Sequence, residues 1–92
     1  LGCTFEEFFK HIEQQFVDGM SWQNRNEWHL DHIVPIAFAT TEDELILLNH
    51  YTNIRPLWAK HNIVKGNKLT EQVIHHPIYS AILKLRSSKN SI

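Results

Sequence analysis

Apolar residues near the start of the chain repeat at the spacing of a helix. One face of that helix would carry Phe5, Phe8, Phe9, Ile12 and Phe16. Steps of three and four residues are typical of a helix that packs against a core. Thr4 and Glu7 match a reciprocal capping box at its start, and Gly19 suits a left-handed end. The pattern predicts a core-facing helix over about 4–18.

Two later runs predict further helices. Thr41 followed by Glu44 matches a second capping box, and the apolar residues after it predict a short inserted helix. Pro77 suits the first position of a helix. We therefore expect a C-terminal helix over about 77–86, with residues 87–92 frayed beyond it.

Two segments between these helices predict strands. Residues 28–33 are followed by Pro35, which ends a ladder, and residues 49–56 predict a turn followed by a second short strand that Pro56 is expected to stop. The two could pair as a small antiparallel ribbon. A helix is expected from about residue 57 or 58 to 64, closed by Gly66. The predicted fold class is α+β.

Composition sets the scale and excludes several classes of protein. A chain of 92 residues with 42% hydrophobic content predicts one domain with one modest core. Cys3 is the single cysteine, which excludes an internal disulfide and a cysteine-clustered zinc site. Apolar runs are short and none resembles a signal segment, so we expect an intracellular protein that is neither secreted nor in a membrane. A start at Leu1 rather than Met is compatible with a piece of a longer protein.

The formal net charge of −1 hides an uneven distribution along the chain. Residues 1–44 hold nine acidic and two basic side chains, a balance of −7, whereas residues 45–92 hold seven basic and one acidic, a balance of +6. Such asymmetry suggests that the second half meets an anionic partner. A charge separation that folding averages out explains the same numbers equally well.

The adjacent pair Asp31 and His32 carries the clearest chemistry. A carboxylate and an imidazole lie among Leu, Ile and Val, where water is scarce. Strand alternation would put His29 and Asp31 on one face and His32 on the other, so both members of the pair can serve one site only if the backbone bends. Asn62 falls inside a predicted helix, where asparagine is a weak choice. A ligand role would explain it.

Three segments together carry a resemblance to a known family. They are residues 31–35 (Asp-His-Ile-Val-Pro), 53–57 (Asn-Ile-Arg-Pro-Leu) and 62–66 (Asn-Ile-Val-Lys-Gly). This set resembles the signature of the HNH endonucleases, which have the ββα-metal, or His-Me finger, fold. The interval of nine residues between Asn53 and Asn62 is similar to that in the HNH domain of RNA-guided DNA nucleases.

The wider pattern extends the resemblance to HNH proteins of phages and large viruses. It includes Gly-Met-Ser-Trp at 19–22, Trp-His at 28–29, Asn-His-Tyr-Thr-Asn at 49–53 and Pro-Leu-Trp at 56–58. The resemblance implies a single HNH nuclease domain over residues 1–92, with its core motif at about 28–68.

The resemblance implies a role for each matching residue. His32 would be the general base that takes a proton from the attacking water, since a histidine accepts protons near neutral pH. Asp31 and Asn62 would hold one divalent ion that stabilises charge at the phosphate. Asn53 would fasten the ribbon and orient His32. The implied activity is a one-metal hydrolysis of phosphodiester bonds in DNA.

The same residues indicate which metal ion would bind and which side chains would contact phosphate. Two oxygen ligands from the protein suit Mg²⁺ or Mn²⁺, whereas Zn²⁺ or Ni²⁺ would become credible occupants if His29 joined the ligands. His29 and His50 are expected to form hydrogen bonds around the site or to serve as additional ligands. Phosphate contacts are assigned to Arg55, Lys65 and Lys68.

The expected partner is double-stranded DNA, contacted at its backbone and minor groove, with a further domain or subunit supplying specificity. Many HNH proteins carry two Cys-x-x-Cys pairs for a structural zinc, and this sequence has none. Two other functions remain open. One is an inactive nucleic-acid-binding module, and the other is a structural metal-binding interaction domain that uses His29, His75 and His76.

Overall fold

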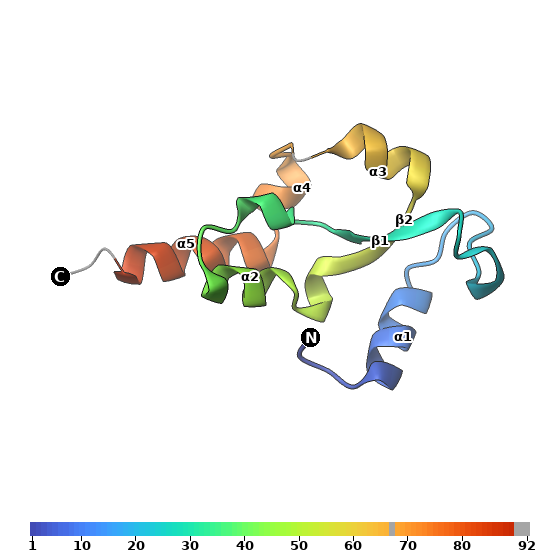
Figure 1. Cartoon of the computed structure of the whole chain (residues 1–92), viewed down its shortest axis with the longest axis horizontal. Helices are drawn as coiled ribbons and strands as arrows, with labels where there is room; N and C mark the ends of the chain where they lie inside the picture. The colour runs from blue at the N-terminus through green and yellow to red at the C-terminus, as the bar shows by residue number, and fades with distance from the viewer. Residues whose placement is uncertain (67, 90–92) are drawn as a thin grey trace.

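A two-stranded antiparallel sheet lies in the middle of the chain, with helices on both sides (Figure 1). The computed structural model describes residues 1–66 and 68–89, and these form a small mixed α+β arrangement. The helices, single 3₁₀ turns (η) and strands follow in the order α1 (Phe5–Glu13), η1 (Trp22–Asn24), β1 (Trp28–His32), η2 (Ile36–Phe38), α2 (Glu42–Leu48), η3 (Tyr51–Asn53), β2 (Ile54–Trp58), α3 (Ala59–Lys65), α4 (Glu71–Ile74) and α5 (Pro77–Lys89).

The predicted antiparallel ribbon is confirmed, but its second strand is longer than expected. β1 and β2 pair from Trp28 opposite Trp58 to His32 opposite Ile54. Pro56 was expected to stop the strand, and instead it lies inside β2 opposite Leu30. Both strands of a two-stranded sheet are edges, where a missing backbone N–H can be tolerated. Because β2 continues to Trp58, α3 begins only at Ala59.

The two faces of the ribbon differ in chemistry. Directly opposed residues of an antiparallel pair share a face, so Asp31 and Arg55 lie on the same face as His29. Trp28 and Ile54 belong to the opposite face and are buried. Helices α1 and α3 lie on opposite sides of the ribbon in Figure 1. The polar face is the one from which Asp31 contacts α3.

An aromatic cluster joins α1 to the apolar face. Its buried members are Ile12, Met20, Trp28 and Ile54, and its partly buried members are Phe8, Phe16, Trp22 and Trp58. The ring of Phe16 lies 5.1 Å from that of Trp22 and 5.3 Å from that of Trp28, measured between centroids. Edge-to-face contacts at such distances stabilise aromatic clusters beyond the area that they bury.

The predicted N-terminal helix is shorter than the interval 4–18. The capping box of Thr4 and Glu7 is confirmed, but α1 ends at Glu13. Gly19 has the predicted left-handed conformation, with φ of 86°, yet it belongs to the turn that follows. The expected apolar face is also only partly buried, since Phe5 and Phe9 are 76% and 53% exposed.

A second apolar cluster lies at the other end of the ribbon. The sequence predicted one core for the chain, and the described residues contain two. The second cluster is formed by the buried residues Val34, Leu48, Val73, Ile78 and Ile82, which come from the segment after β1 and from α2, α4 and α5. The described residues measure 52 × 30 × 19 Å along their principal axes, and α5 points away from the ribbon in Figure 1. None of the described helices is both long and apolar enough to cross a bilayer.

The predicted starts of α2 and α5 are confirmed, but the predicted end of α5 and the predicted capping box of α2 are wrong. Pro77 begins α5, but that helix continues past residue 86 to Lys89; residues 90–92 lie outside the described residues. Thr41 caps α2 by accepting a hydrogen bond from the Glu44 amide. The Glu44 side chain does not complete the expected reciprocal box. It instead accepts hydrogen bonds from Thr40 and Arg86.

Candidate functional site

Asp31 is the centre of the polar face, and both of its oxygens lie in ion pairs. Its side chain is 6% exposed. Arg55 Nε lies 3.0 Å from Oδ2, and Lys65 Nζ lies 2.9 Å from Oδ1 and 3.0 Å from Oδ2. The first contact follows from the strand register, which places Arg55 directly opposite Asp31. The second arises because the last turn of α3 passes over this end of β1.

The ammonium group of Lys65 occupies a small cradle of oxygens. Besides the two carboxylate oxygens of Asp31, it donates a hydrogen bond to the main-chain carbonyl of His32. Three oxygens, one pair of them charged, therefore surround a single positive charge. Such an arrangement is a cation-binding geometry made by adjacent residues of one strand.

Asp31, His32 and Asn62 line one pocket with a volume of about 210 Å³. Lys65 lines the same pocket. The rest of its wall is formed by Leu30, Pro35, Ile36, Ala37 and Gly66. Folding thus brings the predicted base and both predicted metal ligands, which are up to 31 positions apart in the sequence, to the lining of one pocket. The strand register still pairs His32 with Ile54, on the face of the ribbon opposite to Asp31.

Asn62 contacts His29 across the gap between α3 and β1. Asn62 Nδ2 lies 3.4 Å from His29 Nδ1, a distance at which the amide can donate weakly to the ring nitrogen. With its nitrogen directed to His29, the amide of Asn62 keeps its oxygen as the atom that can bind a cation. His29 therefore lies beside a predicted ligand, as expected for a histidine that orients it.

The ring of His32 is held by a residue to which the sequence assigned no role. His32 Nε2 lies 2.8 Å from Asn49 Oδ1. Asn49 follows the last residue of α2, 17 positions from His32. Its only signal in the sequence is its place in the Asn-His-Tyr-Thr-Asn segment, because the contact depends on how α2 packs beside the ribbon.

Asn53 is fully buried and fastens the chain around His32 through the main chain. Its amide nitrogen donates to the carbonyls of Val34 and Leu48, at 3.1 and 2.8 Å, and its oxygen accepts from the Val34 amide at 2.8 Å. The Ile33 amide also donates to the Asn53 carbonyl. Both amide hydrogens are thereby used, so Asn53 orients His32 through the backbone while Asn49 holds the ring.

The remaining predicted residues take different positions. Arg55 bridges Asp31 to α4, because its Nη1 lies 3.0 Å from Gln72 Oε1. Lys68 is exposed. His50 precedes η3 and its Nδ1 lies 2.8 Å from Thr52 Oγ1, so it acts as a hydrogen-bonding residue of that turn. Of the three predicted phosphate ligands, Arg55 and Lys65 are thus bound to Asp31.

The three histidines of the alternative metal site are not brought together. His29 contacts α3, whereas His76 Nε2 lies 3.2 Å from the Thr52 carbonyl oxygen. Burial lowers the pKa of His76, and the charge of Arg55 acts in the same direction against the hydrogen bond to Thr52. Within residues 1–66 and 68–89, no group of three or more His, Cys, Asp or Glu side chains could hold a metal ion.

The donors around Asp31 nevertheless fit an oxygen-preferring cation that is only partly held by protein. Asp31 and Asn62 would supply a carboxylate and an amide oxygen to such a cation, and the Lys65 ammonium already binds the same carboxylate. Mg²⁺ and Mn²⁺ are commonly bound through one or two protein oxygens completed by phosphate and water. A closed tetrahedral zinc site would require more protein ligands.

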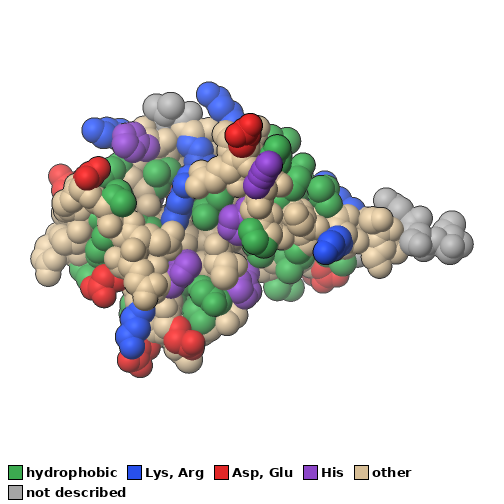
Figure 2. Space-filling model, turned by 180° about the vertical axis from the view of Figure 1, so that it is seen from behind, with side chains coloured by type: hydrophobic (Ala, Val, Ile, Leu, Met, Phe, Trp, Pro, Cys, Tyr) green, Lys and Arg blue, Asp and Glu red, His purple; other side chains and the backbone are tan. Residues whose placement is uncertain are grey.

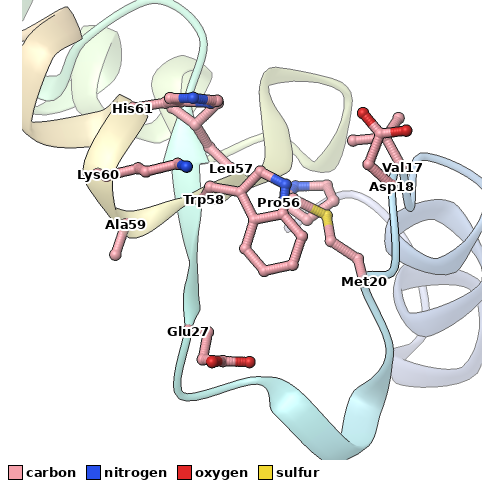
Figure 3. Close-up of a pocket in the computed structure, with 10 residues that line it drawn as sticks. All are labelled: Val17, Asp18, Met20, Glu27, Pro56, Leu57, Trp58, Ala59, Lys60 and His61. Carbon is pink, nitrogen blue, oxygen red and sulfur yellow. The ribbon is translucent and has the colours of Figure 1, made fainter.

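A larger pocket, lined in part by the end of β2 and the start of α3, contains none of the predicted site residues. Its volume is about 770 Å³. Met20 and Trp58, which belong to the same aromatic cluster, both line it, and Figure 3 shows Glu27 and Asp18 well apart from each other. Lys60 and His61 of α3 complete the rim. Its charges are mixed and widely spaced, so size alone does not make it the functional site.

Several histidine side chains lie across the middle of the face shown in Figure 2. Some Lys and Arg side chains lie beside them, and others lie with acidic side chains toward the margins of the same view. Charges of both signs are therefore mixed over this face.

Comparison with known proteins finds two viral relatives. The chain is 33% identical over 94 residues to an uncharacterized protein of Acanthamoeba polyphaga mimivirus, an alignment that covers 98% of this chain and 40% of that protein. It is also 33% identical over 89 residues to a second uncharacterized mimivirus protein, covering 91% of this chain and 39% of the relative. The chain thus spans about two fifths of the length of these relatives. No family model matches it, and neither does any solved structure.

Proposed function

We propose that this chain is an HNH endonuclease domain that hydrolyses DNA phosphodiester bonds with one divalent cation. The main observation that supports this proposal is the pocket that Asp31, His32 and Asn62 line. In this proposal β1, β2 and α3 form the ββα-metal unit, with Asp31 and His32 at the end of the first strand and Asn62 in the helix.

His32 performs the proton transfer in the proposed reaction. When Asn49 Oδ1 accepts a hydrogen from Nε2, the other ring nitrogen, Nδ1, carries the lone pair. That nitrogen takes a proton from water as the water oxygen bonds to phosphorus. The bond from phosphorus to the 3′-oxygen breaks, and the leaving oxygen is protonated by solvent. Asn53 keeps His32 in place by fixing the backbone that follows it.

Asp31 and Asn62 would hold the divalent cation through their oxygens. Bound there, Mg²⁺ or Mn²⁺ supplies positive charge that stabilises the phosphate and the departing 3′-oxygen. His29 orients the Asn62 amide by accepting from its nitrogen. Arg55 contacts Asp31 on its other side and keeps the carboxylate aligned with the strand.

DNA is the proposed substrate because the basic second half of the chain supplies phosphate contacts near the pocket. Lys68 is exposed two residues beyond Gly66, which lines the pocket. Such contacts position a duplex without reading its sequence. Specificity is proposed to come from a further domain or subunit, in line with viral relatives more than twice as long as the aligned region. We also propose that the protein acts inside an infected cell.

A nicking assay tests the proposed function. The protein is incubated with supercoiled plasmid and Mg²⁺ or Mn²⁺, and parallel samples contain EDTA. We expect relaxed circles only where the cation is present, with ends that DNA ligase reseals because the 3′-oxygen is the leaving group. Absence of nicking with either cation, or nicking of equal rate in EDTA, would contradict the proposal.

The second candidate is a nucleic-acid-binding module without activity. The observation in its favour is that Arg55 and Lys65 neutralise Asp31 in the free protein. Such a module would bind plasmid in a salt-dependent manner and yield no relaxed circles. Gel retardation beside the nicking assay therefore separates the two functions.

A further inference from the structure

The contacts of Lys65 conflict with the proposed cation site. Its ammonium group bonds to both oxygens of Asp31 and to the carbonyl oxygen of His32. A divalent cation bound to Asp31 would need the same oxygen lone pairs and the same space. Lys65 and the cation therefore cannot occupy the cradle together.

Formal charge makes the conflict stronger. Asp31 contributes −1, whereas Lys65 and Arg55 contribute +2, so the group as a whole carries +1. A divalent cation that approaches this group meets net positive charge in a partly buried place, where charges interact more strongly than in water. Removal of the Lys65 ammonium would return the group to neutrality.

The two basic residues differ in their freedom to leave. Arg55 is anchored at both ends of its guanidinium, to Asp31 at 3.0 Å and to Gln72 at 3.0 Å. Lys65 lies in the last turn of α3, and its bonds all originate from one ammonium on a flexible four-carbon stem. Lys65 is thus the side chain that can move away while Arg55 continues to hold Asp31.

We propose that Lys65 is a built-in competitor of the divalent cation, and that nucleic-acid phosphate relieves the competition by taking its ammonium. This inference rests on the proposed function, because it assigns a partner to the same site. Lys65 serves as the counter-ion of Asp31 in the free protein and as a phosphate ligand in the complex. Cation and DNA consequently bind cooperatively, and each increases the affinity for the other by the same factor.

Direct titration of Mn²⁺ tests the competition without relying on activity. Isothermal calorimetry is run without DNA on the wild type, on Lys65→Met and on Lys84→Met. We expect Lys65→Met to bind Mn²⁺ at least about fivefold more tightly, the lower end of usual coupling between linked sites. Lys84→Met, which removes an exposed lysine of α5, should bind Mn²⁺ as the wild type does. Circular dichroism checks that each variant folds.

A second variant guards against a folding defect. Lys65→Gln removes the charge but keeps a donor for Asp31, and it should also tighten Mn²⁺ binding. If Lys65→Met is unfolded, the Gln variant decides the result. Equal or weaker Mn²⁺ binding by the folded variants than by the wild type would overturn the competitor role and leave the proposed function standing.

The predicted cooperativity is measured in a His32→Ala background, so that DNA stays intact. With Lys65 present, a short duplex should raise Mn²⁺ affinity at least about fivefold, and with Lys65→Met that increase should shrink toward one. An increase that is the same with and without the lysine would overturn the inference. Failure of every variant to bind Mn²⁺, even with duplex, would overturn both the inference and the proposed function.

Discussion

Asp31 shows how a few neighbours determine the chemistry of one residue. A buried carboxylate is costly unless it is paired, and here Arg55 and Lys65 provide that pairing. Both oxygens of the carboxylate are occupied by these basic groups in the free protein. The polar face of the ribbon is therefore stable without a ligand.

Asn53 is the residue whose loss should most damage the ribbon. Asn53→Ala leaves the Val34 amide and carbonyl and the Leu48 carbonyl without their side-chain partner in a buried region. At about 1 kcal/mol or more for each unsatisfied group, the free energy of unfolding should fall by roughly 3 kcal/mol. Urea denaturation measures this change.

Asn26 supplies the control for that experiment, since its side chain is exposed. Asn26→Ala should change the unfolding free energy by no more than about 0.5 kcal/mol. Equal stability of the Asn53 and Asn26 variants would show that Asn53 does not fasten the chain.

Asn49 should matter for rate rather than for stability. Asn49→Ala removes the hydrogen bond at 2.8 Å that holds the His32 ring, while the side chain itself is exposed. A loosely oriented base should lower the nicking rate by about 10- to 100-fold and leave the urea midpoint nearly unchanged. An unaltered rate would remove Asn49 from the site.

The residues of the site could be named from the sequence more readily than their contacts. Asp31, His32 and Asn62 stood out because a carboxylate, an imidazole and a helical asparagine were unexpected among their apolar neighbours. The ion pair with Arg55 depends on the register of the ribbon, and the bond to Asn49 depends on the packing of α2. Neither is encoded in local spacing.

Among the elements, α2 and α5 are joined by an ion pair that should make stability depend on pH. The Arg86 guanidinium, with the amide of Thr40, lowers the pKa of Glu44 to about 2. A folded-state pKa below the unfolded value means that the stabilisation is complete above the unfolded pKa and is lost as pH falls through the folded one. We expect the urea midpoint to decrease as pH is lowered from about 4.5 toward about 2.

Glu44→Gln provides the comparison for that titration. Without a titrating group, this variant should be less stable at neutral pH and should lose less of its stability between pH 4.5 and 2. Parallel pH profiles for the two proteins would show that the pair with Arg86 does not carry the dependence.

Element boundaries were predictable where local chemistry decides them. The caps at Thr4 and Thr41 and the start at Pro77 were found because each depends on residues within one turn. The end of α1 was wrong by several residues, since Phe16 leaves the helical path to pack against Trp22 and Trp28. Such tertiary contacts override local spacing.

At the scale of the whole molecule, the ribbon links two apolar clusters, and its polar face is turned toward α3. The aromatic cluster holds α1 to the ribbon, and the second cluster holds α2, α4 and α5 together. The acidic first half and basic second half of the sequence meet within the ribbon, where Asp31 pairs with Arg55. The site is thus assembled from both halves of the chain.

The proposed DNA binding should weaken as salt is raised, because its phosphate contacts are assigned to the basic second half of the chain. The logarithm of affinity should fall linearly with the logarithm of salt concentration, and Lys68→Met should reduce the slope by about 0.9 if it removes one phosphate contact. Fluorescence anisotropy with a labelled duplex measures both slopes. An unchanged slope would remove Lys68 from the interface.

The central claim is that His32 acts as the general base beside a cation held by Asp31 and Asn62. Its most direct test is the rate of plasmid nicking in Mn²⁺ by the wild type, by His32→Ala and by the control His75→Ala, which replaces an exposed histidine of the segment before α5. The account predicts a loss of about 10²- to 10⁴-fold for His32→Ala and an unchanged rate for His75→Ala. Wild-type nicking by the folded His32→Ala protein would contradict it.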